Sequence, residues 1–276
     1  MSTHDQEVSK LERELRFFPV ENRRSSVLSP DQIAFFNANG YLSGLRAFRE
    51  PAVTQNRIFS DRVLDRFIQA GLGSYAIDRW HDRIDVIYDL ATTPAILDVV
   101  QDIVGPDIIC WATHYFCKLP GDDMGVAWHQ DCSYWALTPS KTVTVWLAID
   151  DADRENGCMR VIPGSHLHGH IAFRESDAQE KNVLTQTIHQ AEKLGSPVDV
   201  ELQAGEFSLH SDLLVHGSLP NRSQRRRCGL TLRYCSPDVR TYWGWNSWSI
   251  ICRGTDRTGH WANVPRPTTG FDFALQ

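Results

Sequence analysis

Long hydrophobic runs and an excess of basic residues are both missing from this sequence. No stretch of about 18 apolar residues occurs, so no membrane-spanning helix is expected. The formal net charge of -6 and the pI near 6.0 argue against a general nucleic-acid binder, which would present a basic face. Residues 1–18 contain no apolar signal core, so we expect a cytoplasmic protein that binds neither membrane nor nucleic acid.

Paired cysteine motifs are missing as well. The chain has 7 cysteines and no CxxC pair, which argues against a zinc ribbon or a thioredoxin-like site. Most of these cysteines lie in apolar or strand-like stretches, so we expect buried thiols in a reducing compartment. No internal repeat is evident, and a hydrophobic content of 42% suffices for one core of ordinary size.

Helical patterns occupy the N-terminal part of the chain. Periodicity and capping predict helices over four segments: 5–17, 30–37, 60–71 and 93–104. The second of these has Ser29 as its N-cap and Pro30 in its first turn, and Gly40 ends it. Residues 41–43 are predicted to be extended.

Short β-rich segments separated by turn residues follow from about residue 107. They are Ile108–Lys118, Val126–Ser133, Thr142–Ile149, Met159–Ile162, Val198–Leu202, Glu206–Leu209, Leu213–Ser218 and Cys228–Tyr234. This pattern predicts a mainly β fold, a cupin-like jelly roll or double-stranded β-helix with flanking N-terminal helices. We expect one domain over 1–276, divided into a helical flank 1–105, a β-roll core 106–240 and an aromatic C-terminal segment 241–276. An insert at about 166–197 within the core is predicted to contain a short helix.

The pair His129 and Asp131 is the first candidate for a metal site. On a strand, side chains two residues apart leave the same face, so both could enter the barrel together. Two imidazoles and one carboxylate form the facial triad that suits Fe(II) and leaves coordination positions open. His216, at the end of a later β-rich segment, is the predicted third ligand.

A second His-x-Asp pair, His210 and Asp212, competes with the first. By itself either pair is a weak signal. A long β-rich stretch separates His129 from His216, whereas His216 is too close to His210 to lie on a partner strand. His260 lies in an irregular tail. The spacing therefore favours the pair at His129.

An arginine-rich turn follows His216 and leads into the strand Cys228–Tyr234. Alternation places Arg227 and Arg233 on one face of that strand, opposite Leu230 and Leu232. An arginine inside a barrel needs an anion or ordered partners, and its planar fork grips a carboxylate by two hydrogen bonds. We predict that one arginine binds the distal carboxylate of an iron-chelated oxo-acid, with Arg227 preferred to Arg233. The other arginines of the turn are interpreted as solvated.

Together the motifs resemble the phytanoyl-CoA dioxygenase family of Fe(II)/2-oxoglutarate enzymes. The resemblance runs from about Ser29 to Tyr234. Its landmarks are Asn39-Gly40-Tyr41, Trp128-His129-Gln130-Asp131, Val145 to Asp151, Asn156-Gly157, Pro163-Gly164-Ser165-His166, His216-Gly217-Ser218 and Asn221-Arg222-Ser223. The resemblance implies a dioxygenase that uses Fe(II), 2-oxoglutarate and O2 and releases succinate and CO2.

The same resemblance assigns co-substrate contacts to particular residues. The family pattern places the 2-oxoglutarate arginine at Arg227 and a hydroxyl partner at Ser218. Trp146 looks like the family's core tryptophan, and Trp135 matches a tryptophan of the ectoine hydroxylase branch. Phe116 stands where that branch has an asparagine, a departure that leaves one co-substrate contact unassigned. Relatives that halogenate replace the carboxylate by Ala or Gly, so Asp131 implies hydroxylation or a close relative such as desaturation.

The substrate is predicted to be a small polar metabolite. Candidate contacts are Tyr134, His114, Arg160, His170 and Trp243. The aromatic segment around Trp243 could form a cation–π box for an ammonium group, although core packing is the preferred explanation for most of these rings. The chain looks most like the bacterial small-molecule hydroxylases of the family. An aminoalkylphosphonate, 2-aminoethylphosphonate or its N-trimethyl form, is therefore the preferred substrate, ahead of an amino acid, an ectoine-like compound or a natural product.

Two other classes of function compete with the oxygenase. A cupin-like protein could bind metal or 2-oxoglutarate without turnover. A zinc hydrolase could use His129, Asp131 and His216, although Arg227 and Ser218 would then serve no purpose. A homo-oligomer is compatible with all three interpretations.

Overall fold

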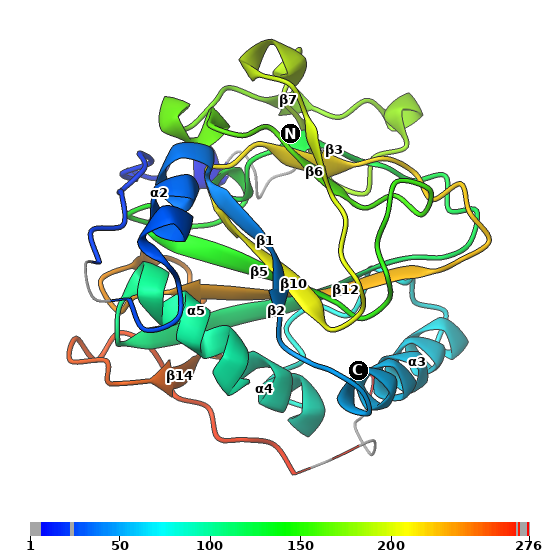
Figure 1. Ribbon diagram of the computed structural model, residues 1–276, viewed down its shortest axis with the longest axis horizontal. Helices are drawn as coiled ribbons and strands as arrows, with labels where there is room; N and C mark the ends of the chain where they lie inside the picture. Colours follow the sequence, from blue (N-terminus) through cyan, green and yellow to red (C-terminus); the bar gives the residue numbers. More distant parts are fainter. Residues whose placement is uncertain (1–6, 23–24, 269, 271–274, 276) are drawn as a thin grey trace.

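Two antiparallel sheets build the body of the protein (Figure 1). The computed structural model describes residues 7–22, 25–268, 270 and 275. The larger sheet has the order β1 (Tyr41–Arg46), β10 (Glu206–Ser211), β5 (Thr142–Ala148), β12 (Arg227–Cys235), β2 (Ile108–Lys118) and β14 (Ile250–Arg253). The smaller sheet has the order β3 (Val126–His129), β11 (His216–Ser218), β6 (Met159–Val161) and β9 (Val198–Val200). The predicted mainly β jelly-roll fold is confirmed.

Alternating side chains give the larger sheet two different faces. On β5, Val143, Val145 and Leu147 pack on the outer face in one cluster with apolar residues of the helices. Trp146 points to the inner face, where it packs with apolar residues of the smaller sheet such as Met159. Period-two alternation therefore separates a helix-covered face from a face that meets the second sheet.

Helices cover the outer face of the larger sheet. They are α3 (Ala52–Gln69), α4 (Asp85–Ala91) and α5 (Pro94–Val104). Figure 1 shows α4 and α5 below the strands β5, β10 and β12, with β3 and β6 of the smaller sheet above them. The helix α2 (Pro30–Asn39) begins at Ser29 with a capping box and ends at Gly40 in the left-handed conformation, as predicted. No helix of the described ranges combines the length and apolar character needed to cross a bilayer.

The predicted helix over 5–17 is wrong beyond its first turn. Residues 5 and 6 lie outside the described residues, 7–9 form one helical turn, and 11–17 lack helical structure. The backbone of this segment bonds elsewhere: Ser140 N donates to Glu14 O, and His170 N donates to Leu15 O. Arg13 donates to the carbonyls of Cys132 and Trp135, both at 2.7 Å. These long-range hydrogen bonds outweigh the local helical preference.

The remaining segments differ from prediction mainly in extent. The insert at 166–197 contains a two-stranded ribbon, β7 (Arg174–Glu175) with β8 (Gln186–Thr187), and short 3-10 turns rather than an α-helix. A second ribbon pairs β4 (Leu137–Thr138) with β13 (Arg240–Thr241). Neither α4 nor β14 was predicted. All 7 cysteines are free thiols, and all but Cys252 are buried.

Candidate metal centre and its cavities

His129 and His216 lie side by side where the edge strand β3 of the smaller sheet pairs with its neighbour β11. His129 ends β3 and His216 begins β11, and the antiparallel register places them directly opposite each other. Their ring centroids are 4.1 Å apart. A strand pair thus brings together two imidazoles that are far apart in the sequence.

Asp131 completes the cluster from a position that corrects one expectation. The predicted strand ends at His129, and Asp131 instead opens a 3-10 turn, η1 (Asp131–Ser133). Its Oδ1 lies 3.8 Å from Nε2 of His129 and 3.9 Å from Nε2 of His216. All three ligating atoms lie within 4.8 Å of one another, the spacing that a single metal ion requires. The turn, and not strand parity, directs the carboxylate toward the two histidines.

Local hydrogen bonds fix the orientation of both imidazoles. Nδ1 of His129 lies 2.9 Å from the carbonyl of Ala127, and Nδ1 of His216 lies 2.9 Å from that of Leu214. Each Nδ1 therefore carries the proton, and each Nε2 offers its lone pair to the centre of the cluster. Such backbone partners are typical of metal-bound histidines.

The ionisation of the cluster also suits a metal. Burial alone would raise the pKa of Asp131, but the neighbouring imidazoles of His129, His210 and His216 hold the pKa well below its usual range. Burial, together with His129 and His210, lowers the pKa of His216 well below its usual value. One carboxylate and two imidazoles form the donor set that suits ferrous iron. The residues present therefore fit an iron ion.

Arg227 lies on one side of this cluster, near the hydroxyl expected to share its anion. The buried guanidinium is 3.4 Å from Ser218 Oγ, and its Nε donates to the carbonyl of Gly157 at 3.0 Å. Its Cζ lies 5.3 Å from the ring centroid of Trp146. Arg227, Ser218 and Trp146 line one cavity together with the three candidate ligands. An oxo-acid chelated to the metal could therefore extend toward Arg227.

A glycine makes room for Trp146 beside that arginine. A Cβ at Gly229 would lie 2.0 Å from Cζ2 of Trp146. Gly229 stands between Arg227 and Thr231 on the inner face of β12. The indole therefore occupies the space that a side chain at this position would need.

A second cavity opens on the other side of the cluster. It has a volume of about 440 Å³ and shares His129 and Asp131 with the first. Arg233 forms part of its wall, and its Cζ lies 5.1 Å from the ring of Trp135 and 5.7 Å from that of Trp111. Nε of Arg233 is buried and has no hydrogen-bond partner among the residues described. A free guanidinium thus borders the space next to the candidate metal.

The predicted substrate contacts fall into two groups. Tyr134 and His114 line the second cavity, and so does Trp135, which was assigned to the co-substrate. Arg160 instead pairs with Asp199 at 3.0 Å, and His170 lies 3.2 Å from Ser133 Oγ, both away from this cavity.

Trp243 also lies outside the second cavity. It is 46% exposed, and its ring packs edge-on against Trp245, which does line the cavity. The aromatic C-terminal segment therefore contributes Trp245 and Trp248 in place of Trp243.

Several residues of the centre were missed by sequence reasoning. Thr144 donates to Oδ2 of Asp131 at 2.8 Å, and strand parity in 142–149 could have placed it on the inner face beside Trp146. Asp78 and Arg79 reach the second cavity from an irregular segment, where no periodicity signals their direction. His210, set aside in the choice between the two pairs, lies 3.6 Å from Oδ2 of Asp131.

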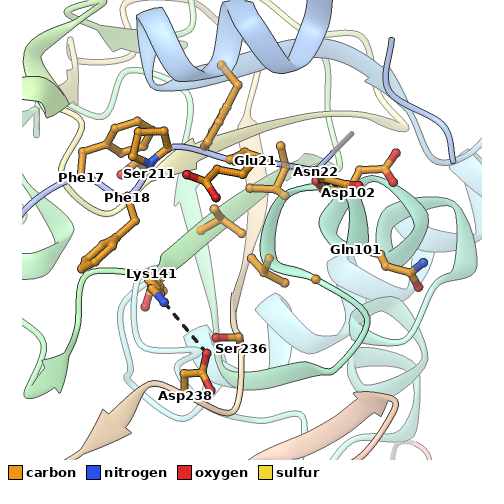
Figure 2. A pocket seen from close by; sticks show the side chains of 18 of the residues that line it. Phe17, Phe18, Glu21, Asn22, Gln101, Asp102, Lys141, Ser211, Ser236 and Asp238 are labelled. Carbon is orange, nitrogen blue, oxygen red and sulfur yellow. Dashed lines mark hydrogen bonds and ion pairs between the residues drawn. The ribbon is translucent and has the colours of Figure 1, made fainter. Parts of the chain in front are cut away.

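A separate cavity of about 450 Å³ lies away from the candidate ligands (Figure 2). It is bordered by Phe17, Phe18 and the end of α5, and Lys141 pairs across it with Asp238 at 4.0 Å. The carboxylate of Asp102 at its edge accepts hydrogen bonds from the backbone of 26–28. None of the three candidate metal ligands lines it, so we assign it no role in the chemistry.

Comparison with known proteins places the chain among oxygenases. The family model described as Phytanoyl-CoA dioxygenase (PhyH) matches residues 27–229. A Caenorhabditis elegans protein named Probable phytanoyl-CoA dioxygenase is 26% identical over 257 residues, covering 80% of this chain and 79% of that protein. A Stutzerimonas stutzeri protein named Probable alpha-ketoglutarate-dependent hypophosphite dioxygenase is 28% identical over 166 residues, covering 59% and 57%.

Solved structures agree with that placement. The non-heme monooxygenase ThoJ in its apo form is similar at a TM-score of 0.75 and 30% identity, covering 87% of this chain and 89% of ThoJ. CytC3 with Fe(II) and alpha-ketoglutarate is similar at a TM-score of 0.65 and 22% identity, covering 92% and 98%. The similarity to CytC3, at 22% identity, shows a shared fold only.

Proposed function

Since the chain belongs to the phytanoyl-CoA dioxygenase (PhyH) family, we propose that it hydroxylates a small zwitterionic metabolite at an iron held by His129, Asp131 and His216. The protein is a non-haem dioxygenase that depends on Fe(II) and 2-oxoglutarate. Bound iron, with 2-oxoglutarate and O2, supplies the oxidising power for attack on an unactivated C–H bond, and succinate and CO2 are the co-products. The observation that carries the proposal is that the triad shares one cavity with Arg227 and Arg233, and that Arg233 also borders the second cavity.

Arg227 and Ser218 are proposed to bind the distal carboxylate of 2-oxoglutarate. The guanidinium is buried and close to Ser218 Oγ, so both can donate to the same anion. Trp146 lies beside them, with its ring centroid 5.3 Å from Cζ of Arg227. These three residues orient the co-substrate for chelation at the triad.

Arg233 is proposed to bind the anionic group of the primary substrate. It borders the cavity that contains His129 and Asp131, and it forms no ion pair with a described residue. A phosphonate or carboxylate on Arg233 would place the adjacent carbon atoms over the triad, where the oxidation takes place.

The ammonium group of the proposed substrate also has candidate partners in this cavity. Asp78 lines the same cavity; its Oδ2 accepts a hydrogen bond from Arg79 Nε at 3.0 Å, and its buried Oδ1 has no hydrogen-bond partner. Indole rings of Trp111, Trp245 and Trp248 form further parts of the wall. A carboxylate among indole faces suits an ammonium or trimethylammonium group. These partners support an aminoalkylphosphonate as substrate, because its two ends carry opposite charges.

An aminoalkylphosphonate is our preferred substrate, 2-aminoethylphosphonate or its N-trimethyl form. One relative is named a probable hypophosphite dioxygenase, which supports recognition of a phosphorus oxyanion. An amino acid, an ectoine-like compound or a natural product carrying a carboxylate is the second candidate, because Arg233 binds a carboxylate by the same fork. We also propose that the chain is a single domain that works in the cytoplasm.

The substrate proposal is tested by turnover and by one arginine variant. Purified Fe(II) enzyme with 2-oxoglutarate should add one oxygen atom to an aminoalkylphosphonate, with stoichiometric succinate measured by mass spectrometry. Arg233→Ala should raise the KM for that substrate by about 100-fold, since a buried charge–charge contact is lost. The KM for 2-oxoglutarate should change little.

Arg160→Ala is the matched control for this experiment. Arg160 is already paired with Asp199 and lies outside the cavity, so its loss should leave both KM values near wild type. Succinate formed only with a substrate that has no anionic group would overturn the assignment of Arg233. An equal increase in the substrate KM in Arg233→Ala and Arg160→Ala would also overturn that assignment.

A further inference from the structure

His210 is a buried imidazole beside the candidate iron centre with no hydrogen bond of its own. It is 1% exposed, and its ring centroid lies 4.5 Å from that of His216. Neither of its ring nitrogens has a hydrogen-bond partner among the residues described. A buried unsatisfied polar group destabilises a fold by about 1–3 kcal/mol, so its presence calls for a role in the loaded site.

The two oxygens of Asp131 face different groups. Oδ1 lies 3.8 Å from Nε2 of His129 and 3.9 Å from Nε2 of His216, which makes it the oxygen on the metal side. Oδ2 accepts a hydrogen bond from Thr144 Oγ1 at 2.8 Å and lies 3.6 Å from Nε2 of His210. The oxygen that faces away from the imidazole pair therefore has two potential donors.

Strand pairing places these two donors next to each other. His210 on β10 is the register partner of Thr144 on β5, so both side chains leave the same face of the larger sheet. Both residues also line the cavity of the candidate ligands. The larger sheet thus presents an imidazole and a hydroxyl to the carboxylate that η1 extends from the smaller sheet.

We propose that His210 is a positioning residue for the iron. Its Nε2–H donates to Oδ2 of Asp131 and, together with Thr144, restricts Asp131 to binding iron through Oδ1 alone. A carboxylate that bound through both oxygens would occupy a position needed by 2-oxoglutarate or O2. This inference rests on the proposed iron site.

A role as a fourth ligand fits the geometry less well. The three ligating atoms that lie within 4.8 Å of one another belong to His129, Asp131 and His216, and no atom of His210 joins this group in the described part of the chain. Its Nε2 approaches Oδ2, the oxygen already bonded by Thr144. His210 therefore contacts the ligand Asp131.

Binding of Mn(II) without 2-oxoglutarate tests the inference directly. Free Mn(II), measured by its EPR signal, gives the dissociation constant for each variant. His210→Phe keeps a ring but removes the donor, and it should weaken Mn(II) binding about 10- to 100-fold, the usual effect of losing a partner of a metal ligand. His210→Gln retains an N–H donor and should recover most of the affinity.

Two further variants separate positioning from packing. Ser208→Ala alters the adjacent inward position of β10, where the hydroxyl is also buried and unpartnered, and it should leave Mn(II) affinity unchanged. The metal-free His210→Phe protein should unfold at the same denaturant concentration as wild type or a higher one, because two unsatisfied nitrogens are gone. Lower stability with unchanged Mn(II) affinity would indicate packing alone and would overturn the inference.

Asp131→Ala distinguishes failure of this inference from failure of the iron site. If Asp131→Ala binds Mn(II) as wild type does, the proposed site itself is wrong. If only Asp131→Ala loses affinity and His210→Phe does not, His210 has no positioning role.

Should the Phe variant not fold, His210→Asn is used instead, since its amide is too short to reach Oδ2. The double variant that combines Thr144→Val with the His210 substitution should lose less or more Mn(II) affinity than the sum of the two single losses. Additive losses of affinity would contradict a shared action of Thr144 and His210 on Oδ2.

Discussion

Three arginines in the turn before β12 occupy three different environments. Arg222 is exposed, and Arg225 forms exposed ion pairs with Asp153 and Glu155. Arg226 donates to Asp150 through Nε at 2.7 Å and also pairs with Asp61 of α3. The expectation that Arg226 belongs to a solvated turn is wrong, because its partners come from segments that are distant in the sequence.

Asp212, the carboxylate of the second His-x-Asp pair, lies in a different environment from His210. It is buried, and Ser140 Oγ donates to its Oδ2 at 2.7 Å. Burial, together with the nearby charge of Asp131, raises the pKa of Asp212 to about 7. Below about pH 7 the protonated form is therefore favoured in the folded protein, and this contribution to stability is complete below about pH 4 and is lost as the pH rises through about 7.

Asp212→Asn should remove that pH dependence. The amide imitates the protonated acid, so wild type and variant should have similar unfolding free energies near pH 4. At pH 8 the variant should be more stable by about 2 kcal/mol, measured by urea denaturation. Asp238→Asn is the control, since this carboxylate is 73% exposed. A constant difference between wild type and Asp212→Asn from pH 4 to pH 8 would contradict the assignment.

At the scale of the element, β12 does most to organise the centre. Its inner face carries Arg227 at one end and Arg233 toward the other, so one strand reaches both cavities. Its outer face carries Leu230 and Leu232, which pack in the helix-covered core. Alternation along this strand was predictable from the sequence, because both faces are buried and the two rows differ in polarity.

Gly229 tests the link between β12 and the co-substrate site. Gly229→Ala should displace the indole of Trp146, since the new Cβ would lie 2.0 Å from Cζ2. The KM for 2-oxoglutarate should rise by about 10-fold or more, because a displaced ring of this size disturbs the adjacent Arg227. Mn(II) affinity should change much less. Gly73→Ala, where a Cβ meets nothing within 4 Å, is the control.

At the scale of the whole molecule, features set by neighbouring residues in the sequence were predictable, and features set by contacts between distant segments were not. The jelly-roll class and the inner face of β12 were predictable, because strand periodicity and turn residues are local signals. The path of residues 11–17 was not, because Arg13 bonds to carbonyls of 132 and 135. The turn at Asp131 and the approach of His210 likewise depend on how the two sheets meet.

Choosing between the two His-x-Asp pairs shows the same division. The distance in sequence to His216 correctly favoured the pair at His129, and the three ligand atoms cluster in the structure. The same reasoning treated the two pairs as alternatives. In the structure His210 lies beside Asp131 of the first pair, whereas Asp212 is hydrogen-bonded to Ser140. Spacing identifies candidate ligands, and only the sheet register reveals what supports them.

The central claim is that His129, Asp131 and His216 hold an iron to which 2-oxoglutarate binds with its far end on Arg227. Anaerobic addition of Fe(II) and 2-oxoglutarate should produce a visible charge-transfer band in the wild-type protein. The band should be absent in the double variant His129→Ala/His216→Ala, which lacks both imidazole ligands. In Arg227→Lys it should require about 10- to 100-fold more 2-oxoglutarate, because the two-pronged contact is lost. The exposed Arg222→Lys variant should titrate as wild type does. No band in the wild-type protein, with zinc-dependent hydrolysis in its place, would contradict the account.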